Sequence, residues 1–329
     1  MKISVIGGGA WGTTLAQTLL DNGHEVIIYD INQDNVNLIN KRKHPFFDVF
    51  LPKNIIATTD LKEAIYFSNY YVLSVPTKVT RSVLKEMNKL INIKSVFINV
   101  SKGIDPDTLC GTSTIVKEEI SKEHLEGYVN LTGPSHAEEL ILRHITLLVS
   151  SSKDKKLASL VQHIFSNNSY LRVYTSSDVI GAEVCASAKN AIAVMSGIIS
   201  GGGGGENARA ALLTRAINEL LIIIKVLGGK KKTVYGLTGI GDLIVTATSN
   251  NSRNYRCGYR LGKGDSLKTI FNEEKQTIEG IRSIEAFHKL SLKLEVELPL
   301  INATYDMIFN NQDLSVCLKK LFLRPLTSE

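Results

Sequence analysis

The sequence predicts an α/β domain with a doubly wound sheet over residues 1–178, followed by an all-α domain over residues 179–329. Two observations support this prediction. In the first half, short apolar runs rich in Val and Ile alternate with segments of helical spacing, as in repeated βα units. After about residue 178, long segments of helical spacing replace the strands. A chain of 329 residues is long enough to bury two hydrophobic cores.

The predicted strands are short apolar runs, the pattern of strands buried on both faces of a parallel sheet. They cover residues 2–6, 25–29, 55–57, 70–75, 95–100, 128–132, 144–150 and 170–174. Helices are predicted over 11–20, 33–40, 60–67, 78–90, 113–121 and 153–166, and in the second domain over 178–199, 207–227, 239–248, 254–262, 279–290 and 298–310. The polar stretch 41–54 and the tract Gly201–Gly205 are predicted to be loops.

The first strand leads into a glycine-rich turn. Gly7, Gly9 and Gly12 fit the pattern G-x-G-x-x-G between a strand and a helix, the context in which this pattern indicates dinucleotide binding by a Rossmann-type domain. Gly7 allows the sharp turn, Gly9 allows close approach of a pyrophosphate, and Gly12 allows the helix to pack on the strand. Asp30 ends the second apolar run about 20 residues further on. The alternative is a purely structural glycine turn in another α/β protein.

Composition narrows the class of protein. The chain is 43% hydrophobic and 21% charged, as in ordinary globular proteins, and its net charge of +6 is scattered along the sequence. We therefore expect a small anionic substrate and no nucleic acid. The four cysteines are far apart, which predicts neither disulfides nor a metal site and fits a reducing compartment. Without a visible signal peptide or an uninterrupted apolar run of ~20 residues, we expect a cytoplasmic protein with no integral membrane segment.

Lys189 is the first candidate for chemistry, because it lies among small and apolar residues on a predicted helix. Such surroundings disfavour the charged ammonium and lower its pKa, which suits proton exchange with a substrate hydroxyl or carbonyl. The alternative is a lysine whose amine extends into water.

Three further polar clusters interrupt apolar surroundings. Ser101–Gly103 follows a predicted strand, at the edge of the sheet where doubly wound folds bind ligands. Asp242 follows two glycines and precedes an apolar helical run, which is a helix-capping position. Arg253 lies between Ser252 and Asn254, a combination suited to holding a phosphate. Capping alone is the alternative for Asp242, and exposed loop polarity is the alternative for the cluster around Arg253.

Together these clusters resemble the bacterial NAD(P)-dependent glycerol-3-phosphate dehydrogenase family. The resemblance runs from Lys2 to about Asn310, with the family's segments in order. Those segments stand here as Gly7–Thr13, Ser101–Gly103, Gly133–Glu139, Lys189–Asn190, Asn207–Arg215, Gly239–Leu243, Ser252–Asn254 and Glu279–Gly280.

The resemblance implies a role for each matched residue. Lys189 would be the general acid–base, with Asp242, Thr246 and Asn190 orienting it and the substrate. Lys102 would bind the substrate and polarise its carbonyl. The remaining substrate contacts would come from Gly133, Ser135, Ser252, Arg253 and Asn254. The dinucleotide, NAD(H) or NADP(H) without a metal, would contact Gly7, Gly9, Ala10, Trp11, Gly12, Asp30, Lys102, Ala137, Arg253 and Glu279. The substrate would bridge the two domains.

Three positions depart from the family pattern. Asp30 stands where NADPH-using members have a small residue followed by a basic one, and a carboxylate there favours the ribose 2′-OH of NADH over a 2′-phosphate. His136 replaces a common Phe, to which we assign no catalytic role. The tract Gly201–Gly205 is richer in glycine than is usual in the family.

The expected reaction is the reversible reduction of dihydroxyacetone phosphate to sn-glycerol 3-phosphate, which supplies glycerophospholipid synthesis. The alternatives are another two-domain dehydrogenase, of the 3-hydroxyacid or 6-phosphogluconate type, and a non-catalytic dinucleotide sensor. The clusters around Asp242 and Arg253 favour the phosphorylated triose, and the presence of Lys102 and Lys189 argues against the sensor. The resemblance also implies a homodimer.

Overall fold

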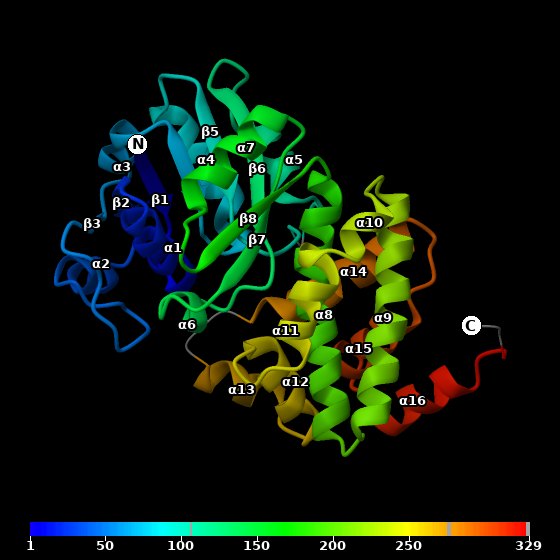
Figure 1. Cartoon of the computed structure of the whole chain (residues 1–329). Helices are drawn as coiled ribbons and strands as arrows, with labels where there is room; N and C mark the ends of the chain where they lie inside the picture. The colour runs from blue at the N-terminus through cyan, green and yellow to red at the C-terminus, as the bar shows by residue number, and fades with distance from the viewer. Residues whose placement is uncertain (106, 275–277, 327–329) are drawn as a thin grey trace. The chain divides into compact units, whose positions relative to one another are not determined.

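The computed structural model describes residues 1–105, 107–274 and 278–326, and the chain divides into two compact units (Figure 1). The first unit comprises Met1–Lys102 and Cys110–Glu183, and the second comprises Gly103–Leu109 and Val184–Glu329. Relative to the predicted boundary after residue 178, the segment up to Glu183 groups with the first unit and the short segment Gly103–Leu109 with the second.

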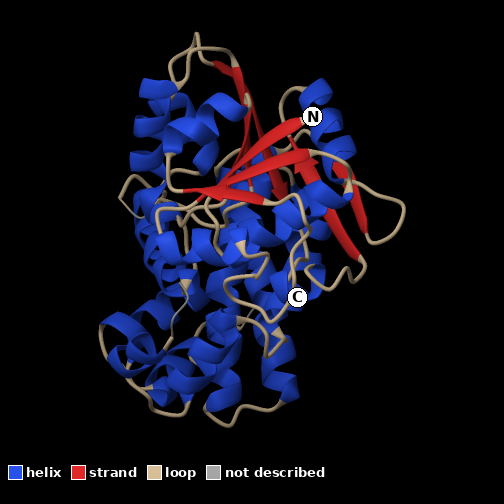
Figure 2. Cartoon of the chain, turned by 90° about the vertical axis from the view of Figure 1, so that its left-hand side faces the viewer, coloured by secondary structure: helices blue, strands red, loops and turns tan. Residues whose placement is uncertain are grey.

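The first unit is built on one eight-stranded sheet with the order β3-β2-β1-β4-β5-β6-β7-β8, drawn in red in Figure 2. All neighbouring strands are parallel except β6 and β7, which are antiparallel. The strands are β1 Lys2–Ile6, β2 Glu25–Tyr29, β3 Ile56–Thr58, β4 Tyr70–Leu73, β5 Ser95–Asn99, β6 Leu125–Thr132, β7 Thr146–Ser151 and β8 Leu171–Ser176. The predicted doubly wound sheet is confirmed, with this one antiparallel pair added.

Both faces of the sheet are buried, which explains the near-continuous apolar runs of its strands. Ile3 and Val5 of β1 belong to one hydrophobic cluster, whereas Ile6 belongs to a second cluster that also contains Tyr71 and Phe97. Successive side chains of a strand point to opposite faces, so each run supplies both clusters. The helices of this unit are α1 Ala10–Asp21, α2 Gln33–Asn40, α3 Leu61–Phe67, α4 Thr77–Leu90, α5 Thr112–Glu119, α6 Ala137–Leu140 and α7 Lys155–Phe165.

The second unit is helical in its described residues, and α8 crosses into it from the first unit. Its elements are α8 Val179–Gly201, α9 Glu206–Val226, α10 Lys231–Val234, the π-helix η1 Leu237–Gly241, α11 Asp242–Ala247, α12 Arg253–Gly262, α13 Leu267–Glu273, α14 Glu279–Lys293, α15 Pro299–Phe309 and α16 Leu314–Phe322. Sequence periodicity missed the short helices α6, α10, α13 and α16. It also merged η1 and α11 into one predicted helix over 239–248, because side-chain spacing does not distinguish one π-turn from α-helix.

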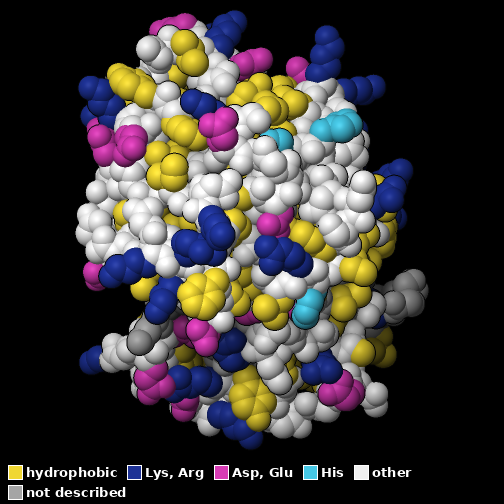
Figure 3. All heavy atoms as spheres, turned by 60° about the vertical axis from the view of Figure 1, so that its left-hand side comes forward, with side chains coloured by type: hydrophobic (Ala, Val, Ile, Leu, Met, Phe, Trp, Pro, Cys, Tyr) yellow, Lys and Arg dark blue, Asp and Glu magenta, His cyan; other side chains and the backbone are white. Residues whose placement is uncertain are grey.

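Helix α8 is long and apolar enough to cross a membrane by length and composition, but 89% of its most apolar 18-residue segment is buried inside the structure. It therefore has the character of a core helix. Of the tract predicted as a loop, Gly201 ends α8, and Gly202–Gly205 form the turn to α9, with Gly203 at φ +86°. On the face drawn in Figure 3, Lys and Arg side chains are interspersed with acidic and hydrophobic ones.

Candidate functional site

The glycine-rich turn has the geometry that dinucleotide binding requires. Gly7 has φ +113°, a conformation that favours glycine. A Cβ on Gly12 would overlap the carbonyl oxygen of Gly7, so α1 packs against the turn more closely than any other residue would allow. A Cβ on Gly9 would meet nothing within 4 Å, so this side of the turn is open to a ligand. Gly9 is the N-cap of α1 and offers no capping side chain, which leaves the helix N-terminus to a phosphate.

Asp30 lies beside this turn and is only 8% exposed. Its Oδ2 accepts a hydrogen bond from the backbone N–H of Gly8 at 2.8 Å, and its Oδ1 accepts one from Asn32 at 2.8 Å. The carboxylate therefore fixes the middle of the glycine turn, in addition to any contact with a ribose. Sequence reasoning assigned only the ribose contact.

Lys102 lies after β5 and reaches across to the end of β6. Its Nζ donates to the carbonyl oxygen of Gly133 at 3.3 Å and to Ser135 Oγ at 3.1 Å. The same ammonium lies 6.0 Å from the ring centroid of Trp11, in the glycine turn. Trp11 Nε1 is buried without a hydrogen-bond partner among the described residues, so it is a donor suited to a polar ligand.

Ala137 is the first residue of α6, close in sequence to Ser135, and His136 is its N-cap without a capping side-chain bond. The predicted residues of the first unit follow four strands: Gly7, Gly9, Ala10, Trp11 and Gly12 come after β1, Asp30 after the neighbouring β2, Lys102 after β5, and Gly133 and Ser135 after β6. Asp30 bonds the turn at Gly8, and Lys102 contacts Trp11, Gly133 and Ser135.

The second unit brings Lys189 together with Asp242 and Thr246. Lys189 Nζ donates to Asp242 Oδ1 and, at 3.0 Å, to Thr246 Oγ1. These side chains are buried, with Lys189 5% and Asp242 0% exposed. The Thr246 hydroxyl donates to the Asp242 backbone carbonyl at 2.6 Å, which turns a lone pair toward the ammonium. The buried carboxylate favours the charged form of the lysine, against the effect of desolvation.

Two sequence-based alternatives are therefore wrong. Lys189 does not extend its amine into water, because its ammonium is paired inside the unit. Asp242 is not an N-cap: it is the first residue of α11, directly after the π-helix η1, and its carboxylate bonds Lys189. π-Helical turns occur often at functional sites, where they displace a side chain from regular helical spacing.

The cluster at the start of α12 is tied to the residue after Lys189. Asn254 Nδ2 donates to Asn190 Oδ1 at 3.0 Å, and Asn254 Oδ1 accepts the N–H of Gly280 at 2.9 Å. Ser252 is the N-cap of α12, and its Oγ accepts the N–H of Tyr255 at 3.2 Å. Ser252 is therefore a buried helix cap, and exposed loop polarity does not describe it.

Arg253 and Glu279 are linked electrostatically. Burial raises the pKa of the Glu279 carboxyl, and the positive charges of Arg282 and Arg253 oppose that effect. Glu279 opens α14, so the first turns of α12 and α14 place Arg253, Asn254 and Glu279 in one region of the second unit.

Glycines set the distance between α8 and α12, a feature that sequence reasoning missed. A Cβ on Gly258 would overlap the carbonyl oxygen of Val194, and one on Gly201 would overlap that of Tyr259. Gly197 and Gly262 are similarly confined by the facing backbone. Gly197 and Gly201 on α8 are four residues apart, as are Gly258 and Gly262 on α12. This spacing was the available signal, since residues four apart share a helix face.

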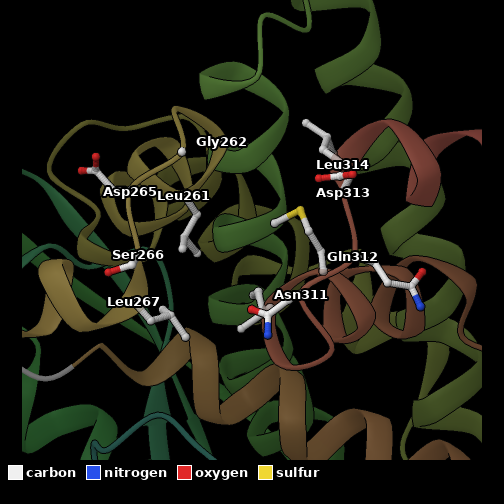
Figure 4. A pocket seen from close by; sticks show the side chains of 12 residues that line it. Leu261, Gly262, Asp265, Ser266, Leu267, Asn311, Gln312, Asp313 and Leu314 are labelled. Atoms are coloured by element: carbon white, nitrogen blue, oxygen red, sulfur yellow. The ribbon is translucent and has the colours of Figure 1, made fainter.

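A cavity of about 440 Å³ lies elsewhere in the second unit, between the end of α12 and the start of α16 (Figure 4). Asp265, Ser266, Asn311 and Asp313 are among its lining side chains. None of the site residues predicted from the sequence lines this cavity.

These features define a class of protein: nicotinamide-dependent dehydrogenases with a Rossmann-type N-terminal domain and a helical domain that supplies the proton-exchanging group. Family models give the particular family. The NAD-dependent glycerol-3-phosphate dehydrogenase N-terminus model matches residues 2–158, and the corresponding C-terminus model matches residues 178–319. The chain belongs to the NAD-dependent glycerol-3-phosphate dehydrogenase family.

Relatives and solved structures agree with this family. Glycerol-3-phosphate dehydrogenase (NAD(P)+) of Acholeplasma laidlawii is 53% identical over 329 residues, covering 100% of this chain and 99% of the relative. The enzyme of the same name from Phytoplasma mali is 45% identical, with 100% and 99% coverage. The crystal structure of glycerol-3-phosphate dehydrogenase from Coxiella burnetii matches with a TM-score of 0.91 and 30% identity, covering 98% of this chain and 99% of that one. Matches to both domain models favour this family over the hydroxyacid and 6-phosphogluconate types.

Proposed function

We propose that this chain catalyses the reversible transfer of a hydride between NAD(P)H and dihydroxyacetone phosphate, giving sn-glycerol 3-phosphate. The observation that supports this function best is the buried cluster of Lys189, Asp242 and Thr246, because hydride addition to a carbonyl places negative charge on its oxygen and a positioned proton donor accelerates that step. The membership of the whole chain in the family supplies the substrate class.

Lys189 is the proposed general acid in the direction of reduction. Its Nζ gives a proton to the C2 oxygen of the substrate, and in the direction of oxidation it takes that proton back. Asp242 holds the ammonium in place. After Lys189 has given up its proton, the buried carboxylate has no counter-charge, which is strongly unfavourable, so Asp242 favours reprotonation of the amine. Thr246 directs the ammonium through its hydroxyl oxygen.

Lys102 and the start of α12 are proposed to hold the substrate. Lys102, with Gly133 and Ser135, binds and polarises the substrate carbonyl. Arg253 with Ser252 and Asn254 takes the phosphate, since a guanidinium beside the N-terminus of a helix provides several N–H donors for an anion. Asn190 orients Asn254 and hence this phosphate clamp.

The glycine turn fits a nicotinamide dinucleotide, because the position of Gly9 is open and Trp11 Nε1 is an unpartnered buried donor among the described residues. Gly7, Gly9, Ala10, Trp11, Gly12, Asp30, Lys102 and Ala137 would hold it, with Arg253 and Glu279 of the second unit. The nicotinamide ring supplies or accepts the hydride when bound. We propose NADH as the preferred donor, because a carboxylate at Asp30 repels a 2′-phosphate.

We further propose a cytoplasmic homodimer whose product enters glycerophospholipid synthesis. A soluble enzyme is consistent with the family and with the burial of α8 inside the structure. Sedimentation equilibrium of the purified protein tests the dimer.

The function is tested by the initial rate of dihydroxyacetone phosphate reduction, with NADH and NADPH in parallel. Rapid oxidation of NADH and slower oxidation of NADPH would support the substrate and the role of Asp30. If the protein oxidised neither cofactor, the proposal would be contradicted.

Lys189→Ala should bind NADH normally, as followed by the fluorescence of Trp11, the single tryptophan, yet reduce the substrate at least ~100-fold more slowly. A near-normal rate in this variant would remove Lys189 as the acid.

A further inference from the structure

Four buried polar side chains of the first unit have no role in the reaction described above. They are Asn99 at the end of β5, Tyr128 and Asn130 on β6, and Glu183 on α8, and each is less than 9% exposed. Buried polar groups lower stability unless they are fully hydrogen-bonded, so their presence in the core needs a reason.

Asn99 binds both backbone groups of the residue that precedes Lys102. Its Oδ1 accepts the N–H of Ser101 at 3.2 Å, and its Nδ2 donates to the carbonyl oxygen of Ser101 at 3.0 Å. Ser101 Oγ in turn donates to the carbonyl oxygen of Val75 at 2.6 Å. One amide thus fixes the backbone from which the Lys102 side chain leaves the sheet.

Asn99 also ties this strand end to the next strand. Asn99 and Asn130 are in register between β5 and β6, and Asn99 Nδ2 donates to Asn130 Oδ1 at 2.8 Å. Strand β6 continues from Asn130 to Thr132, and the next residue is Gly133, whose carbonyl oxygen accepts a hydrogen bond from Lys102. The asparagine pair therefore sets the separation of the two segments that Lys102 joins.

Tyr128 and Glu183 form a second buried pair, and Tyr128 lies two residues before Asn130 on β6. The Tyr128 hydroxyl donates to Glu183 Oε1 at 2.6 Å, and Glu183 also accepts from the N–H and the hydroxyl of Ser113, both at 2.7 Å. Burial raises the pKa of the Tyr128 phenol well above its usual value, and the neighbouring Asn99 amide acts in the opposite direction. The two buried pairs share β6, because Tyr128 and Asn130 are two residues apart on that strand and their side chains therefore point to the same face of the sheet.

Stability alone does not account for these two buried pairs. Asn130 Nδ2 is buried without a hydrogen-bond partner among the described residues, so this donor lowers stability relative to an apolar pair at the same register. An apolar pair would leave the Ser101 backbone without its two side-chain bonds. We propose that Asn99, paired with Asn130 and supported by Tyr128 and Glu183, is a positioning residue that aims Lys102 at the substrate; this inference rests on the substrate-binding role proposed for Lys102.

The test is a double-mutant cycle between Asn99 and Lys102 in the full-length protein, with kcat, KM for dihydroxyacetone phosphate and calorimetric NADH affinity measured for each variant. Asn99→Ala should lower kcat/KM at least about tenfold, because misplacing a binding group by about 1 Å has effects of this size or larger. Its NADH affinity should fall no further than that of Lys102→Ala, since Lys102 is also a proposed cofactor contact. If Asn99 acts through Lys102, the Asn99→Ala/Lys102→Ala variant should be no slower than Lys102→Ala alone.

Asn69→Ala is the matched control, because Asn69 also donates from its amide to a backbone carbonyl, that of Lys94, but lies before β4. It should keep kcat/KM within about twofold of wild type. Should Asn99→Ala not fold, Tyr128→Phe removes only the hydroxyl bonded to Glu183 and should lower kcat/KM about threefold, again without further effect on Lys102→Ala.

Unchanged kcat/KM in a folded Asn99→Ala protein would overturn the positioning role. So would additive losses in the double variant, since a merely structural defect adds to the loss of Lys102. A wild-type protein that does not reduce dihydroxyacetone phosphate would instead refute the proposed function, and the two failures are therefore distinguishable.

Discussion

Lys189 and Asp242 form a buried ion pair between α8 and α11, and neither side chain is more than 6% exposed. The two residues are far apart in sequence, and η1 precedes Asp242. Removing one partner of a buried pair leaves an uncompensated charge in the interior, which is much more costly than removing both. One substitution in this pair should therefore change both the stability and the activity of the protein.

Asp242→Asn should impair both properties, because the shape is kept while the counter-charge of Lys189 is lost. We expect kcat to fall at least ~100-fold. The free energy of unfolding, from urea titration, should fall by about 3–5 kcal/mol.

The control is Glu285→Gln, which breaks the exposed pair between Glu285 and Lys289 on α14. That change should alter the unfolding free energy by at most ~0.5 kcal/mol, since water already screens the pair. Equal effects of the two substitutions would contradict a special role for the buried pair.

Asp30→Asn should shift the choice of cofactor toward NADPH. The substitution removes the charge that repels a 2′-phosphate but retains one oxygen for the N–H of Gly8. The ratio of kcat/KM for NADH to that for NADPH should fall at least about fivefold, the equivalent of about 1 kcal/mol. Asp34→Asn, the same change at an exposed position of α2, serves as the control. A ratio unaffected by Asp30→Asn would show that this carboxylate only shapes the glycine turn.

The sequence predicted features formed by residues that are near one another in the chain, and it did not predict contacts between residues that are far apart in the chain. The turn at Gly7, Gly9 and Gly12 and the sheet strands are local patterns, so sequence reasoning identified them. The partner of Lys189 was not local: sequence spacing suggested a capping role for Asp242, whereas η1 and tertiary packing direct its carboxylate to α8. The family resemblance, and not periodicity, supplied that pairing. The network around Asn99 has no sequence signature, because it depends on the register of β5 and β6.

Gly258→Ala should separate α8 from α12 and displace the phosphate clamp. Its new methyl group would overlap the Val194 carbonyl oxygen, and backbone cannot move aside as a flexible side chain can. Overpacking of this kind lowers stability by about 1–3 kcal/mol. We also expect KM for dihydroxyacetone phosphate to rise while the affinity for NADH stays the same. Gly205→Ala is the matched control, because a Cβ there meets nothing within 4 Å. Equal KM values for the two variants would contradict a positioning role for Gly258.

Glu219 on α9 should make the stability of the helical unit depend on pH. Its carboxylate accepts the N–H groups of Leu300 and Ile301 at 2.6 and 3.2 Å, at the start of α15. Burial raises its pKa from 4.5 to about 7, although those two bonds and the charge of Arg324 oppose the shift. The folded state therefore binds this proton more tightly than the unfolded state. The resulting stabilisation is fully present below about pH 4.5 and is lost as the pH rises to about 7.

Glu219→Gln, which cannot titrate, should remove this dependence. Between pH 5 and pH 8, the unfolding free energy of the wild type should fall relative to that of the variant by an amount approaching about 3 kcal/mol, the equivalent of the shift in pKa. Urea titrations of both proteins across this range measure the difference. Glu206→Gln, the same substitution at an exposed position in the first turn of α9, should instead run parallel to the wild type. Parallel curves for Glu219→Gln as well would mean that the carboxylate remains charged in the folded protein throughout this range.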